Sequence, residues 1–92
     1  MKVIFITAVQ FNGTRQHENI ASVRWVDCRN GVSKSAPRAT MVKFIDDGNT
    51  LQVAGEQGPA IVQVVRPRVG EPYLRTHRDG NPSNDLLSLP TY

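Results

Sequence analysis

The chain is short of cysteine, of long apolar runs and of aromatic residues, and each shortage excludes a class of protein. Among its 92 residues Cys28 is the single cysteine, so no intramolecular disulfide can form and a reducing, cytoplasmic location is expected. The apolar start ends at polar Gln10 and Asn12 without a small-residue cleavage pattern, which argues against a signal peptide. No stretch approaches the roughly 20 apolar residues of a membrane span, so no membrane partner is expected.

Catalytic and metal-binding motifs are also missing. His17, Glu18, Asp27, Cys28 and His77 carry metal-ligand or nucleophile chemistry, but their spacing matches no C-x-x-C, H-x-x-x-H or H-E-x-x-H pattern. No G-x-S-x-G and no glycine-rich phosphate loop is present. We therefore expect no metal, no cofactor and no enzymatic activity, with a small enzyme kept as the third hypothesis.

Composition describes one ordinary globular domain spanning residues 1–92. Apolar residues make up 39% and charged residues 21% of the chain. A domain of this size supports one modest core and has little room for a deep, enclosed active site. The net charge of +3 is mildly basic, which keeps nucleic acid among the partners to be considered.

Hydrophobic patterning predicts an α+β fold, a mostly antiparallel twisted sheet of about five strands with one helix packed on one face. The first two strands should form a hairpin, and residues 55–59, which hold two glycines, should be a hairpin loop. The expected order is β-β-α-β-β-β, with strands at residues 3–11, 20–28, 50–54, 60–65 and 73–77.

The helix is predicted over residues 35–47. Ser35 can act as its N-cap, and Pro37 fits a first turn, where its missing N–H costs nothing. Gly48 stands where a left-handed residue commonly ends a helix. Residues 81–92 then form a tail, beginning with a turn at Asn81 and Pro82, whose leucines are expected to dock on the sheet.

A basic cluster with one aromatic residue precedes the tail. In a strand, Tyr73, Arg75 and His77 would share one face, an arrangement that can hold single-stranded nucleic acid or another anionic partner. The alternative is a solvated face whose arginines pair with nearby acids, as scattered surface arginines usually do. The candidate face comprises Arg66, Arg68, Tyr73, Arg75, His77 and Arg78.

Several short motifs resemble a small bacterial and phage-associated family, domain-of-unknown-function family 3892. The resemblance covers nearly the whole chain, and it implies no activity, cofactor or partner. The family often carries His-Glu-His where this chain has residues 17–19, His-Glu-Asn, which argues further against a metal. The motifs are Val-Arg-Trp at residues 23–25, Met-Val at 41–42, Tyr-Leu-Arg-Thr at 73–76, Asp-Gly at 79–80 and Leu-Leu-Ser-Leu-Pro at 86–90.

Two functions of different kinds remain after these exclusions. The first is a non-catalytic binding or assembly module whose partner is a protein or a second copy, favoured by the missing catalytic motifs, the apolar strands and the leucine tail. The second is a nucleic-acid-binding module that uses the basic face, which would bind in a salt-dependent manner.

Overall fold

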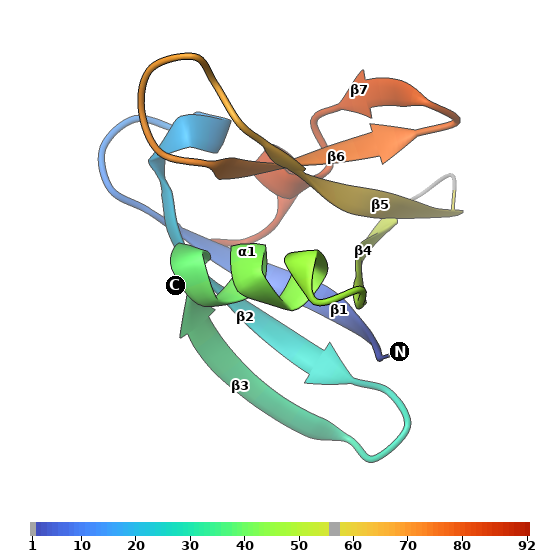
Figure 1. Ribbon diagram of the computed structural model, residues 1–92. Coiled ribbons are helices and arrows are strands. Elements are labelled where there is room, and N and C mark those ends of the chain that lie inside the picture. Colours follow the sequence, from blue (N-terminus) through green and yellow to red (C-terminus); the bar gives the residue numbers. More distant parts are fainter. Residues whose placement is uncertain (1, 56–57) are drawn as a thin grey trace.

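One curled sheet of seven strands holds a single α-helix against it in the computed structural model, which describes residues 2–55 and 58–92 (Figure 1). The strands lie in the order β3-β2-β1-β4-β5-β6-β7. They are β1 Val3–Phe11, β2 Ile20–Asp27, β3 Val32–Pro37, β4 Thr50–Gly55, β5 Gly58–Val65, β6 Tyr73–Arg78 and β7 Asn81–Ser83. The helix is α1 Arg38–Asp46, and the 3₁₀ turns are η1 His17–Asn19 and η2 Leu86–Ser88.

The prediction of about five strands was too low, because it missed both edge strands. β3 is polar, yet the turn at Gly31, with φ +73°, returns it along β2 so that all six of its residues pair. β7 was predicted as a turn. Asp79 and Gly80 instead make the reversal themselves, with φ of +54° and +81°, the geometry of a tight hairpin turn, and lay β7 on β6. The predicted loop at residues 55–59 includes residues 56 and 57, outside the described residues.

The sheet is mixed, because a parallel strand pair lies among the antiparallel ones that were predicted. The expected β1–β2 hairpin is present, but β1 also pairs in parallel with β4, Val3 opposite Thr50 and Phe5 opposite Gln52. Parallel pairing needs a crossover connection. β3 runs in the same direction as β1, and α1 carries the chain from β3 across the sheet to the far side of β1.

The helix begins three residues later than predicted. Ser35 is not its N-cap, because it lies in β3 opposite Arg24, and Pro37, with φ −69° and ψ 160°, is the N-cap residue instead. Pairing with β2 therefore extends to the last residue before the helix. Gly48 follows the helix with φ +95°, the left-handed conformation expected there. No helix in the described part of the chain is long and apolar enough to cross a bilayer.

The core lies on the face of the sheet that α1 covers, here called the inner face. Figure 1 shows α1 between the β2–β3 hairpin and strands β5–β7, and α1 contacts β2 through β6. Trp25, which alternates with Val23 in β2, is partly buried and packs against this core. The buried apolar residues are Ile4, Ile6, Val9, Ile20, Val23, Met41, Leu51, Val53, Val62, Leu74 and Leu86.

The C-terminal segment returns to β1. Val9 donates its N–H to the carbonyl oxygen of Pro90 at 3.0 Å, and Tyr92 donates its N–H to the carbonyl oxygen of Val9 at 3.3 Å. Leu86 of η2 is fully buried in the core. Beyond it the Tyr92 ring lies under the Arg24 guanidinium, 4.7 Å from carbon to centroid. The segment thus covers the part of β1 that β4 does not reach.

Candidate functional site

The structure divides the predicted basic cluster. Arg66 pairs with Asp46 at the end of α1, with 2.5 Å between Nη2 and Oδ2. Arg68 is exposed in the β5–β6 loop. Arg78 alternates to the inner side of β6, where it binds Asp85. Two of the four predicted arginines are therefore neutralised by carboxylates, so the local positive charge is smaller than the sequence suggests.

Tyr73, Arg75 and His77 do alternate on one face of β6, opposite the buried Leu74 and Thr76. On the neighbouring strand, Gln63 pairs with Arg75 and Ile61 with His77, and Ile61 is 48% exposed. A shallow hollow of about 370 Å³ lies here. Arg75 Nε and His77 Nδ1 are buried without a hydrogen-bond partner among the described residues. This outer face is open, but it carries little uncompensated charge. The hollow is lined by Pro59, Ile61, Gln63, His77, Arg78, Asp79 and Gly80.

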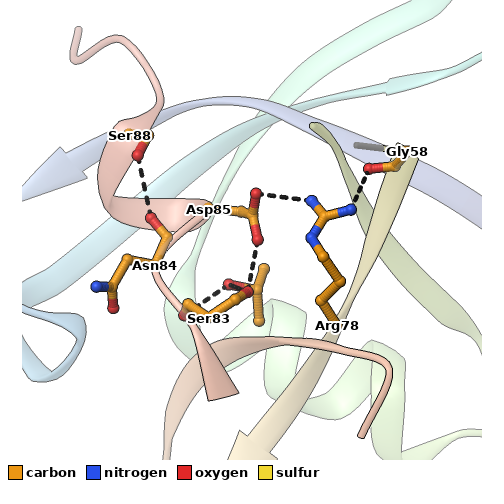
Figure 2. A network of polar contacts seen from close by, with 7 residues as sticks. Gly58, Arg78, Ser83, Asn84, Asp85 and Ser88 are labelled. Atoms are coloured by element: carbon orange, nitrogen blue, oxygen red, sulfur yellow. Dashed lines mark hydrogen bonds and ion pairs between the residues drawn. The ribbon is translucent and has the colours of Figure 1, made fainter. Parts of the chain in front are cut away.

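A polar network lies at the β7 end of the sheet (Figure 2). Arg78 donates to Asp85 at 2.8 Å and to the carbonyl oxygen of Gly58 at 2.9 Å. The Ser83 hydroxyl lies 2.5 Å from the second oxygen of Asp85 and 2.9 Å from the hydroxyl of buried Thr76. The Arg78 and Asp85 side chains are only about one-fifth exposed (19% and 20%). The network ties β5, β6, β7 and the segment before η2 into one unit.

The same network sets the protonation of Asp85. The hydrogen bond from the Ser83 hydroxyl, helped by the hydrogen bond and positive charge of Arg78, holds the pKa of Asp85 below its ordinary value of 3.8, although partial burial acts in the opposite direction. Asp85 is therefore ionised at neutral pH.

His17 is the second group with a shifted pKa. It lies buried in η1, which packs against β6. Burial, with a smaller contribution from the nearby Arg75 charge, lowers the pKa of His17 below 6.5, so the imidazole is neutral at pH 7. His17 does not join the other predicted metal candidates, since the described residues contain no cluster of three or more His, Cys, Asp or Glu side chains able to hold a metal.

The opposite edge of the sheet is open. β3 has six residues, all exposed except half-buried Ala36, and no other described segment pairs with its outer side. Lys34 is the one charged side chain on the strand. This edge strand was not predicted, although the Asn30–Gly31 pair directly after a strand is a hairpin signal that indicates it.

A groove adjoins this open edge on the inner face. It lies where the β2–β3 hairpin meets α1 and has a volume of about 250 Å³. Its floor is apolar, from Ile4, Trp25, Met41 and Phe44. Its rim is polar. The rim residues are Lys2, Asp27, Lys34, Ser35 and Thr40, with Ala36 completing the lining.

Comparison with known families agrees with the resemblance seen in the sequence. A model of a family of proteins of unknown function, DUF3892, matches residues 5–90, and the chain belongs to this family. Comparisons with curated proteins and with solved structures gave no match. The family carries no assigned activity, so the function has to be argued from the two edges, the outer face and the groove.

Proposed function

We propose that this chain is a non-catalytic protein-binding module, which captures an extended segment of another protein as an added strand beside β3. The supporting observation is that β3 is a six-residue exposed edge strand, whereas the other sheet edge, β7, has only three residues with Pro82 at its centre. The unpaired backbone groups of an edge strand form a template for pairing, and strand addition is a recurrent mode of peptide recognition.

The partner segment is expected to be acidic. Lys34 pairs with Trp25 across the hairpin and so points to the inner face, where no carboxylate lies within ion-pairing distance of it in the described residues. An acidic side chain on the same face of the added strand could reach it. The chain's charge of +3 favours such a partner over a basic one.

Pairing of β3 with a second copy of itself is less favourable. If the two inner faces stay on the same side, opposed residues must point to that same side. Two registers then pair the most residues. In the first, Lys34 of one copy lies opposite Lys34 of the other, and like charges directly opposite each other destabilise a sheet. The other brings Pro37, which has no N–H, into the ladder.

Nucleic acid is the weaker alternative. The Arg66 and Arg78 ion pairs leave Arg75 and His77 on the outer face, with Arg68 in a loop. Nucleic-acid surfaces usually gather a denser basic patch. The conjunction of Tyr73, Arg75 and His77 on one face supports this alternative and makes it an outcome to be tested.

A peptide titration tests the proposal on the whole chain. The probe is a capped six-residue peptide of alternating threonine and valine with one central glutamate, followed by NMR of the backbone amides. We expect the amide signals of residues 32–36 to shift and their hydrogen exchange to slow. The matched controls carry N-methyl groups on alternate residues. Methylating the set that faces β3 should abolish binding, and methylating the other set should not.

Three results would contradict strand addition at β3. Equal binding of both N-methylated peptides would exclude a backbone ladder. A concentration-dependent dimer whose interface maps to residues 32–36 would show that the partner of β3 is a second copy of the chain and not another protein. Shifts confined to Arg75 and His77 on titration with a single-stranded oligonucleotide, reversed by added salt, would favour the nucleic-acid alternative.

A further inference from the structure

The groove between α1 and the β2–β3 hairpin has an apolar floor that is available to a ligand. Met41 and Ile4 are almost fully buried at its base, while Trp25 is half-buried at its side. In the described part of the chain the Trp25 indole N–H makes no hydrogen bond. A concave apolar surface of this kind, with a few polar groups around it, is typical of small-molecule sites.

Two lysines stand at the rim without an acidic partner. The backbone of Lys2 is fixed from both sides, because its N–H donates to Asn49 Oδ1 at 2.9 Å and its carbonyl oxygen accepts the Thr50 N–H at 2.8 Å. Lys34 is held by its place in β3. No carboxylate of the described residues lies within 4.0 Å of either ammonium group, so both positive charges remain available to a ligand.

The one carboxylate on the rim is already engaged. Asp27 is buried, accepts the N–H of Arg29 at 3.0 Å and lies 3.7 Å from Arg29 Nε. Asp27 is thus held by Arg29 within the β2–β3 turn. The groove as a whole combines two free ammonium groups and the Thr40 side chain with an apolar floor.

From this arrangement we infer that the groove binds a small monocarboxylate with a compact aromatic or branched apolar body. The apolar body would lie against Trp25, Met41 and Phe44, and the carboxylate would accept hydrogen bonds from the Lys2 and Lys34 ammonium groups at the rim. The volume of about 250 Å³ is below the roughly 300–1,000 Å³ of drug-sized ligand sites, which fits a ligand of this small size. This site shares Lys34 with the proposed peptide site but does not use the backbone edge of β3, so it does not depend on strand addition.

Trp25 makes the test direct, because it is the only tryptophan of the chain. We would titrate the full chain with 3-phenylpropionate while following tryptophan fluorescence and the NMR signal of the Met41 methyl group. The neutral amide of the same acid is the matched ligand. We expect saturable changes at both reporters for the acid and binding weaker by about threefold or more for the amide, the size of a partly exposed ion pair.

Lysine variants then test which ammonium groups bind the carboxylate of the ligand. Lys2→Gln and Lys34→Gln should each weaken binding of the acid but not of the amide, whereas Lys43→Gln, an exposed lysine of α1 that pairs with Asp47, should change neither. Lys2 lies outside β3, so its variant separates this site from the peptide site. Equal affinity for acid and amide, the same loss with Lys43→Gln, or no saturable change at Trp25 would each overturn the inference, whatever the peptide titration shows.

Discussion

The two outer edges of the sheet, β7 and β3, differ in length and in their contacts with the rest of the chain. β7 has three residues with Pro82 at its centre, and Asp85, Ser83 and Arg78 bind it to the strands beside it. β3 has six residues and carries Lys34 as its one charge. Short length, proline and lysine all protect a sheet edge from unwanted pairing, and β3 is the longer edge strand, with its proline only at its last position.

This difference separates stability from recognition. At the β7 edge, the polar groups are satisfied internally and the leucine segment closes the core behind them. At the β3 edge, the backbone groups face outward, and the lysines on the adjoining groove have no acid to bind among the described residues. We therefore expect substitutions at the β7 end to change folding, and substitutions at the β3 end to change binding.

The largest effect is expected from Leu86→Ala. Leu86 is fully buried in the core, so removing its side chain leaves a cavity and should lower the free energy of unfolding by about 2–5 kcal/mol. Half-buried Leu87 in the same turn is the control, and Leu87→Ala should cost clearly less. Urea unfolding measures both. Equal losses for the two variants would mean that η2 is held by its backbone and not by the packing of Leu86.

Asp85→Asn should have the next largest effect. It keeps the shape but removes the charge that Arg78 and Ser83 contact, at a cost of about 1–3 kcal/mol. Asp46→Asn, at the exposed pair with Arg66, should cost less than about 1 kcal/mol. Chemical unfolding at neutral pH compares them. If the two losses were the same, the β7 network would be no stronger than a surface ion pair.

The acid dependence follows from the lowered pKa of Asp85. Because its folded pKa lies below 3.8, the unfolded chain takes up the proton first as the pH falls. The stability that Asp85 contributes is present above its ordinary pKa and is lost as the pH falls through the folded pKa. The Asp85→Asn variant should therefore lose less stability than the parent chain below about pH 4. Unchanged acid sensitivity would contradict this.

A smaller effect of pH should come from His17, which lies beside β6. Its pKa is below 6.5 in the folded chain, so the unfolded chain binds the proton first and stability falls as the pH drops through 6.5. Melting curves between about pH 7 and pH 5 should show this fall. His17→Gln should reduce it, while His77→Gln, on the outer face, should keep the part due to His17. If the His17→Gln variant lost as much stability over this pH range as the parent chain, the pH effect would come from another group.

Much of the fold could be predicted, because the central strands carry their own signal. β1, β2, β5 and β6 are rich in β-branched or alternating apolar residues, and the first hairpin follows from them. The edge strands carry no such signal. β3 is mostly small and polar, and its pairing depends on β2 and on the turn at Gly31, so it is a product of tertiary context.

The candidate site was less predictable for a related reason. Spacing along β6 places Tyr73, Arg75 and His77 on one face, but it cannot show that Asp46 lies beside Arg66 or Asp85 beside Arg78. Those pairs join segments that meet only after folding. The groove could not be predicted either, because only the geometry of the hairpin against α1 leaves Trp25 and Phe44 partly exposed beside the buried Met41.

The smallest effect on stability, and the clearest on binding, is expected from Lys34→Glu at the open edge. The side chain is exposed and unpaired in the described structure, so the free energy of unfolding should change by no more than about 0.5 kcal/mol. The same variant should lose the glutamate-containing peptide and gain the matching peptide with a central lysine, because the opposed charges are exchanged. Chemical unfolding and the peptide titration provide the two measurements. A large loss of stability would show that β3 is as closely built into the fold as β7, and an unchanged peptide preference would show that Lys34 does not face the added strand.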